Sequence, residues 1–238
     1  MQAHPRRSPT SSAERRGSIA SSLPNPPVQL ITGAWTDAAD LCRRVDAALR
    51  GGIRWVQLRA KARPAREIHE SAMLLAPMLK EAGALLVIND RVDVAIACAA
   101  GGVHLPEDGM AAADARRLLG DSAWIARSVH SADSARIARD QDLDALQLGP
   151  VFETPSKHAF GPARGLEDLA RAADAIREIP MRLVAVGGIS GERAAACRHA
   201  GADAVSVIGA IWDSRHVEDA AREIVQIMMT TSLHQPFS

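Results

Sequence analysis

The sequence predicts an α/β protein built as a single (β/α)8 barrel of the TIM type, with a disordered N-terminal tail. Short apolar, β-branched runs recur along the chain, and each is followed by a turn and then by an Ala-, Leu- and Arg-rich stretch with helical spacing. Eight such units fit into about 205 residues, and alternating strands and helices build a parallel sheet. An open doubly wound sheet is the alternative. It favours a glycine-rich fingerprint after the first strand, which Thr32-Gly33-Ala34-Trp35 does not supply.

The predicted elements follow one another in order. The strands are the runs VQLIT at 28–32, WVQLR at 55–59, LLVIN at 85–89, GVHL at 102–105, WIARS at 124–128, ALQL at 145–148, LVAV at 183–186 and AVSVI at 204–208. Helical spacing of apolar residues is clearest over 66–80, 111–119, 165–176 and 216–228. We therefore expect a helix after each strand.

Residues 1–26 differ from the rest of the chain. They are rich in Ser, Pro and Arg, and Glu14 is their single acid. Such a segment buries too little apolar surface to offset the entropy lost on ordering, so we predict a disordered tail. An organelle transit peptide is the alternative, but several prolines interrupt any amphipathic helix. The barrel domain is then expected over 27–229, followed by a short tail at 230–238.

Composition argues against several classes of partner. The formal net charge is +0, so no overall field attracts nucleic acid or a membrane surface. Aromatic residues make up 3% of the chain, too few for base-stacking platforms, and no apolar run approaches the roughly 18 residues that span a bilayer. Cys42, Cys98 and Cys197 lack metal-ligand spacing and predict buried thiols in a reducing, cytoplasmic compartment. The sequence leaves a homo-oligomer open.

A barrel also predicts where the chemistry takes place, namely at the C-terminal ends of the strands and in the loops that follow them. Polar residues and glycines accumulate there, directly after the apolar runs. They are Gln57, Arg59, Lys61, Asn89, Asp90, Glu107, Asp108, Ser128, His130, Thr154, Ser156, Lys157, Gly187, Gly188, Ile208 and Gly209. This clustering predicts a single site.

Arg59 and Lys61 are candidates for binding a polyanion such as diphosphate. The chain contains three lysines, and a lysine kept among so many arginines suits a compact point charge. The two residues lie two positions apart, so both side chains can point the same way from a strand end. Lys157 lies in a Pro-, Ser- and Gly-rich loop of the kind that often forms a lid. A surface salt bridge and an inert loop are the alternatives.

Asn89 and Asp90 end the third predicted strand. Asp90 could hold Mg²⁺ through one carboxylate, with substrate phosphates and water completing the octahedron, while Asn89 donates to a phosphate oxygen. A helix cap is the alternative for both. His104 and His130 lie at strand ends and are candidate general acids or bases, although a structural role is more common for a lone histidine. Ser128 has no evident base partner.

Two glycine-containing loops follow the last two strands. Gly187 and Gly188 come after the seventh strand, and Ile208 and Gly209 end the eighth. In barrels these two loops often bind phosphate through backbone N–H groups near a helix N-terminus. Simple turn formation is the alternative.

Within residues 28–228 the motifs QLRAK at 57–61, INDRVD at 88–93, GVHL at 102–105, GPVF at 149–152, SK at 156–157 and VGGI at 186–189 follow in this order. With this set the chain resembles the thiamin phosphate synthase family, including its TenI-type thiazole tautomerase branch. The resemblance implies an enzyme that joins an aminopyrimidine methyl diphosphate to a thiazole phosphate and releases diphosphate. In that dissociative reaction the thiazole nitrogen captures a pyrimidine-methyl cation, so the protein mainly supplies position and charge.

The resemblance also implies roles for individual residues. The pyrimidine diphosphate would bind to Gln57, Arg59, Lys61 and Asn89. Asp90 would ligate Mg²⁺, and Ser128 and Lys157 would contact the departing diphosphate. The thiazole phosphate would be held by Thr154, Ser156, Gly188, Ile208 and Gly209.

Two positions depart from the family pattern. The second Mg²⁺ ligand of the synthases is an Asp at the position of Gly109, so we expect Asp108 to take its place. The catalytic His of the tautomerases is replaced by Pro150, although RSVHS at 127–131 and VFET at 151–154 resemble that branch. A Mg²⁺-dependent synthase is the leading hypothesis. A thiazole tautomerase and a non-catalytic protein that binds thiamin-pathway ligands are the alternatives.

Overall fold

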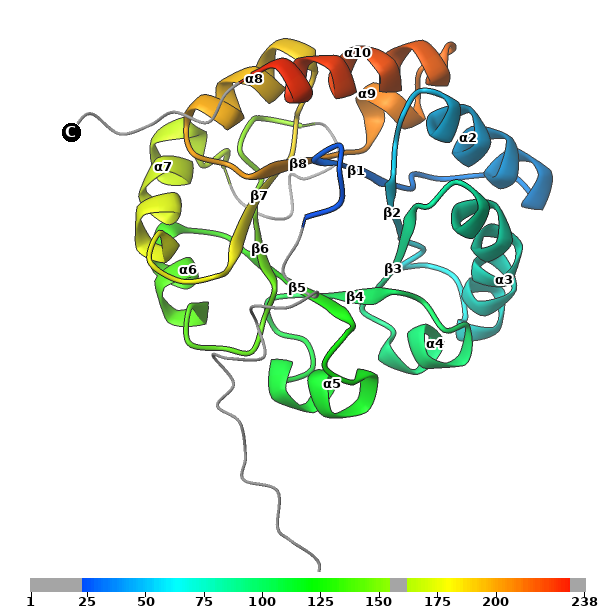
Figure 1. The fold of residues 1–238 in the computed structure, drawn as a ribbon, viewed down its shortest axis with the longest axis horizontal. Helices are drawn as coiled ribbons and strands as arrows, with labels where there is room; N and C mark the ends of the chain where they lie inside the picture. Colours follow the sequence, from blue (N-terminus) through cyan, green and yellow to red (C-terminus); the bar gives the residue numbers. More distant parts are fainter. Residues whose placement is uncertain (1–22, 155–161, 232–238) are drawn as a thin grey trace, which may run out of the picture.

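The computed structural model describes residues 23–154 and 162–231 and confirms the predicted barrel. Its eight strands form a closed parallel sheet in chain order, and β1 pairs with β8 to complete the ring. Figure 1 shows the ring of strands with the helices packed around its outside. The strands are β1 (Val28–Ile31), β2 (Trp55–Leu58), β3 (Leu85–Asn89), β4 (Gly102–Leu105), β5 (Trp124–Val129), β6 (Ala145–Leu148), β7 (Arg182–Val186) and β8 (Ala204–Val207).

A helix follows every strand, as expected. The helices are α2 (Ala38–Arg50), α3 (Ala65–Glu81), α4 (Val92–Ala97), α5 (Ala112–Leu119), α6 (Ala132–Ala138), α7 (Gly165–Ile176), α8 (Gly191–His199), α9 (Gly209–Trp212) and α10 (Val217–Thr230). The short helix α9 between β8 and α10 is an addition to the predicted pattern. In the described part of the chain no helix is long and apolar enough to cross a membrane.

The second strand ends one residue earlier than predicted, and a side chain explains the difference. The Arg59 N–H donates to Thr32 Oγ1 at 2.9 Å instead of to a neighbouring backbone carbonyl. Thr32 N–H still donates to Gln57 O at 3.0 Å. This exchange ends the β1–β2 ladder and turns the following residues out of the sheet, where their side chains become available to a ligand.

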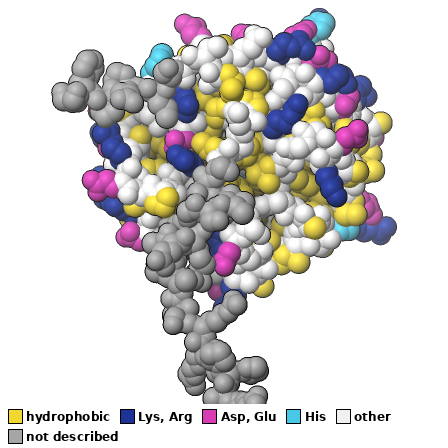
Figure 2. All heavy atoms as spheres, in the orientation of Figure 1, with side chains coloured by type: hydrophobic (Ala, Val, Ile, Leu, Met, Phe, Trp, Pro, Cys, Tyr) yellow, Lys and Arg dark blue, Asp and Glu magenta, His cyan; other side chains and the backbone are white. Residues whose placement is uncertain are grey.

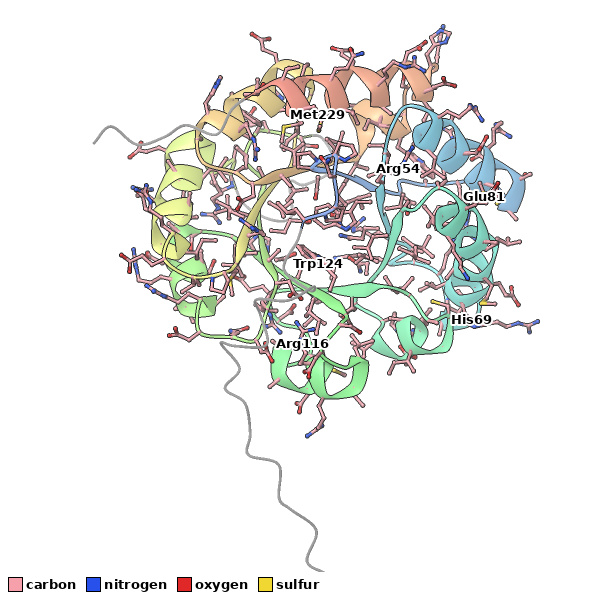
Figure 3. All side chains as sticks on the ribbon, in the orientation of Figure 1. Arg54, His69, Glu81, Arg116, Trp124 and Met229 are labelled. Carbon is pink, nitrogen blue, oxygen red and sulfur yellow. The ribbon has the colours of Figure 1, made fainter. Side chains whose placement is uncertain are left out.

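The lower part of the barrel interior is filled by an apolar cluster. It consists of Trp55, Val87, Trp124, Ala126, Ala145, Val184 and Ala204, and Leu23 packs against it. The rings of Trp55 and Trp124 meet edge to face, with centroids 5.3 Å apart. Figure 3 places Trp124 near the middle of the ring, whereas His69 and Glu81 lie on the outer helix α3. The cluster closes the N-terminal end of the barrel, so a ligand has to enter from the other end.

Two carboxylates, the buried Asp144 and the partly buried Asp203, connect neighbouring strands near this base. Asp144 accepts from Ile125 N at 2.7 Å and pairs with Arg116 at 2.8 Å. Asp203 accepts from Leu183 N at 2.8 Å. Burial raises the pKa of both carboxyls above the usual range, despite these donors.

On one face of the molecule the charged side chains lie mostly away from the middle (Figure 2). Figure 2 shows hydrophobic side chains toward the middle of the visible face and charged side chains mainly around its rim. Most ion pairs among the described residues join positions three or four apart on one helix, such as Arg66 with Glu70. Exposed pairs of this kind contribute little to stability. The charges at the C-terminal ends of the strands are therefore the ones to examine for function.

Candidate functional site

Two adjoining pockets open at the C-terminal ends of the strands. The first, which we call the β3–β5 pocket, has a volume of about 450 Å³. The second, which we call the β7–β8 pocket, has a volume of about 950 Å³. Arg59, Lys61 and Ile208 line both pockets. Two ligands could therefore bind side by side with a shared cationic wall between them.

The strand period explains which residues reach the β3–β5 pocket. On β2, Trp55 belongs to the apolar base, while Gln57 lines the pocket above it together with Arg59, which follows the strand. Alternate residues of a strand point to the same side, so the same rule brings in residues from the other strands. The pocket is lined by Ile31, Gln57, Arg59, Lys61, Asn89, Asp90, His104, Pro106, Glu107, Asp108, Ser128, His130, Gln147, Val186 and Ile208.

Arg59 is a partly buried cation at the shared wall. No carboxylate within the described residues forms an ion pair with its guanidinium, and burial lowers its pKa. An arginine stays charged at any ordinary pH, and a half-buried charge without a counterion is unfavourable. The Thr32 hydroxyl bonded to its N–H helps fix the direction in which the side chain leaves the strand. The arrangement favours an anionic ligand at this position.

Two histidines stand beside Ser128. His104 is 3% exposed, and its Nε2 lies 2.8 Å from Ser128 Oγ. His130 Nδ1 lies 2.6 Å from Gly149 O, so it carries the proton and donates to this carbonyl. Its Nε2 faces Glu107 Oε2 at 4.0 Å. Ser128 thus has a histidine partner that the sequence pattern did not indicate.

Three carboxylates line the same pocket as Arg59. Asp90 has a φ of 65°, a left-handed conformation that Asp tolerates better than most residues, and its N–H donates to His104 O at 2.8 Å. The alternative role as a helix cap is not supported, because the N-cap of α4 is Arg91 and receives no side-chain hydrogen bond. Glu107 and Asp108 are exposed and follow β4.

This donor set fits Mg²⁺ in one particular way. Mg²⁺ takes oxygen ligands and usually binds one or two carboxylates together with substrate phosphates and water. Within residues 23–154 and 162–231 no group of three or more His, Cys, Asp or Glu side chains could hold a metal by itself. Asp90 and Asp108 beside Arg59 fit an ion that arrives with a polyphosphate rather than an ion held in an all-protein cage.

The glycines of the β7–β8 pocket are required by their surroundings. Gly187 and Gly188 have φ values of 101° and 65°. A Cβ on Gly187 would lie 2.6 Å from Pro150 Cα, and one on Gly188 would lie 2.7 Å from Glu153 O. Only glycine permits both this conformation and this close approach. The loop therefore presents bare backbone to the pocket at the start of α8.

Arg193 joins this loop and was missed by the sequence interpretation. Its Nη1 donates to Gly188 O at 2.7 Å, and its guanidinium lies 4.8 Å from the centroid of Phe152. It belongs to the first turn of α8, where the helix dipole disfavours a cation. A basic residue in a first turn was the signal that could have indicated it.

Trp35 and Arg63 also line the β7–β8 pocket and were also missed by the sequence interpretation. Arg63 stacks over the Trp35 ring at 4.5 Å, and its Nη2 donates to Trp35 O at 3.0 Å. An ion pair also joins Arg63 to Glu67 at 3.1 Å. This stacked pair and Arg59 line the same β7–β8 pocket.

The structure sorts the predicted site residues between the two pockets. Gln57, Asn89, Asp90, Asp108 and Ser128 line the β3–β5 pocket. Thr154, Gly187, Gly188 and Gly209 line the β7–β8 pocket, and Arg59, Lys61 and Ile208 line both. Ser156 and Lys157 lie outside the described residues, as do 1–22 of the predicted N-terminal tail and 232–238 of the C-terminal one.

Comparisons with known proteins agree with this geometry. The family model for thiamine monophosphate synthase matches residues 28–211. The chain is 41% identical over 189 residues to a putative thiamine-phosphate synthase of Geobacter sulfurreducens, covering 79% of this chain and 87% of the relative. It is 40% identical over 207 residues to the thiamine-phosphate synthase of Chlorobium luteolum, covering 87% and 95%. The solved thiamine phosphate pyrophosphorylase from Pyrococcus furiosus has a TM-score of 0.75 and 30% identity, covering 86% and 96%.

Proposed function

The chain belongs to the thiamine monophosphate synthase family, and we propose that it is a transferase that makes thiamin phosphate. It moves a hydroxymethylpyrimidine group from its diphosphate to the nitrogen of a thiazole phosphate and releases diphosphate. The observation that carries this proposal is the shared wall of Arg59, Lys61 and Ile208 between two adjoining pockets. A reaction between two phosphorylated substrates requires such an arrangement.

The β3–β5 pocket suits the pyrimidine diphosphate. Arg59 and Lys61 face its phosphates, and Gln57 lies deeper, where the ring would enter. The β7–β8 pocket suits the thiazole phosphate, because the Gly187–Gly188 backbone and Arg193 can receive a phosphate there. The two reacting atoms then meet near Ile208. Holding them in contact supplies much of the rate enhancement for such a reaction.

Bond breaking places new negative charge on the departing diphosphate. Arg59 and Lys61 stabilise that charge at the mouth of the pocket. If His104 Nε2 donates to Ser128 Oγ, the Ser128 hydroxyl keeps its own proton for a phosphate oxygen. Asp90 and Asp108 would hold a Mg²⁺ ion, which when bound neutralises part of the diphosphate charge. Lys157, outside the described residues, is proposed as a further contact to the diphosphate.

The proposal includes a cytoplasmic location. Cys42, Cys98 and Cys197 are all free, and the last two are buried. Unpaired thiols are typical of a reducing compartment.

The test supplies the purified chain with both substrates and Mg²⁺ and measures thiamin phosphate. We expect product with Mg²⁺, little after chelation, and a strong loss in Arg59→Met. Both substrates binding without product would refute the proposal. Conversion of a thiazole carboxylate phosphate without any need for Mg²⁺ would instead indicate the tautomerase. A strain that requires thiamin because it lacks its synthase gives an independent readout by rescue.

A further inference from the structure

A layer of buried polar side chains forms the floor of the β3–β5 pocket. Gln29, Gln57, Gln147 and Ser206 belong to β1, β2, β6 and β8 and are 1%, 1%, 6% and 1% exposed. The layer below them is apolar. Gln29 Nε2 is buried and has no hydrogen-bond partner among the described residues, which is unfavourable. Stability alone therefore does not explain an amide layer here.

Hydrogen bonds connect the four side chains in a row. Gln57 Nε2 donates to Gln29 Oε1 at 3.2 Å. Ser206 Oγ lies 2.7 Å from Gln29 Oε1 and 3.0 Å from Gln147 Oε1. Gln57 and Gln147 stand at the two ends of the row, and both also line the β3–β5 pocket. The direction of the hydrogen bonds along the row therefore decides whether each of these amides turns its oxygen or its nitrogen toward a ligand.

Both contacts of Ser206 Oγ are to amide oxygens, and the hydroxyl cannot donate to both of them. A hydroxyl has one proton and can donate to only one of the two amide oxygens. The oxygen and nitrogen of an amide have nearly the same shape, so the hydrogen bonds decide which is which. If Ser206 and Gln57 both donate to Gln29, only the Gln147 amide has to be reversed, so that it donates to Ser206. The opposite polarity requires reversing both Gln29 and Gln57.

The simpler arrangement turns two carbonyl oxygens, those of Gln57 and Gln147, toward the pocket. We propose that Gln147 is a specificity-determining residue for the pyrimidine substrate, whose exocyclic amino group donates its two hydrogens to Gln57 and Gln147. Gln29 and Ser206 are positioning residues that fix the direction of the row. This inference rests on the proposed function and adds a residue to its pyrimidine site. A ring with oxygen in place of the amino group would place an acceptor against two buried acceptors and would be rejected.

The test measures binding by calorimetry, so it does not depend on turnover. The ligands are the aminopyrimidine diphosphate and its analogue with oxygen in place of the amino group. We expect the wild type to prefer the amino compound by about 100-fold, and Gln147→Met to reduce this preference by about tenfold. Ser206→Ala is expected to reduce it several-fold, because the row loses its polarity. Gln226→Met, which is exposed on α10, is the control and should change nothing.

Circular dichroism shows that each variant is folded before its binding is compared. An unchanged preference in a folded Gln147→Met protein overturns the inference, and so does a wild type that prefers the oxygen analogue. Binding without turnover overturns the proposed activity, while the change in preference still decides the role of Gln147. A wild type that binds neither compound overturns both proposals.

Discussion

Gly188→Ala tests whether the β7–β8 pocket is built by close packing of bare backbone. Gly188 has a φ of +65°, and an added Cβ would lie 2.7 Å from Glu153 O and 2.9 Å from Phe152 Cβ. The left-handed conformation alone costs an alanine about 1 kcal/mol. The overlap adds about 1–3 kcal/mol, because the neighbours are backbone and a side-chain root that cannot rotate away. The free energy of unfolding should therefore fall by about 2–4 kcal/mol.

Gly83→Ala is the matched control for this prediction. Gly83 has a φ of +62°, but nothing lies within 4 Å of its added Cβ, and it follows α3 far from the pockets. Urea unfolding of both variants separates the strain of the conformation from the overlap. Gly188→Ala should also raise KM for the thiazole phosphate without raising KM for the pyrimidine diphosphate. Equal losses of stability in the two variants would refute the packing argument, and a change in only the other KM would refute the pocket assignment.

Three further predictions follow from the same structure. Arg59→Met should lower kcat/KM by about 100-fold or more, yet leave the unfolding midpoint unchanged or raised, because the half-buried guanidinium has no described carboxylate partner; a lower midpoint would show that the residue stabilises the fold. Asp108→Asn should raise the Mg²⁺ concentration for half-maximal rate by about tenfold, and adding Gly109→Asp should not restore it, because a Cβ at Gly109 would lie 2.7 Å from the Pro106 ring; restored affinity would show that the loop adapts. Burial raises the folded pKa of Asp203 above 3.8, so the folded state binds a proton that the unfolded state has released; relative to Asp203→Asn, the free energy of unfolding of the wild type should fall as the pH rises from about 4 through the raised pKa, and the opposite slope in urea unfolding would contradict the burial argument.

Most of the framework could be predicted because local pattern and fold agree. The run at 85–89 is short and apolar, and it forms β3 with the predicted bounds. The placement of Asn89, Asp90 and Ser128 then follows, because parallel strands bring their C-terminal ends to one edge of a barrel. The local pattern could not predict where a side chain takes the place of a backbone hydrogen bond between two strands. The end of β2 at Leu58 depends on Thr32, which follows a different strand, β1.

The missed site residues share a physical reason. Gln147 stands inside an apolar run, and its inward direction is known only from the register that pairs it with Ser128. Arg193 and Trp35 lie on a helix and a loop, where the sequence does not fix which side faces a pocket. The histidine partner of Ser128 is 24 residues away along the chain. Contacts of this kind arise from the closure of the barrel, not from spacing.

The polarity of the barrel interior increases from the base to the mouth. This gradient determines the orientation in which a substrate can bind. The base is apolar, the middle layer consists of amides and a hydroxyl, and Arg59 and Lys61 lie at the mouth. A ligand with a neutral ring and a charged tail can enter only with the ring inward, because the amide floor offers no counter-charge to a diphosphate. The bond to be broken then lies between the ring and the cations, next to the β7–β8 pocket. The departing diphosphate is nearest to solvent and to the charges that stabilise it, whereas the ring-methyl carbon faces the second substrate. The same gradient predicts the effect of placing a cation in the amide floor. Gln57→Lys would let a diphosphate bind in the inverted orientation, with its charge toward the floor. In that orientation the diphosphate binds but no transfer occurs, and binding without transfer can be measured.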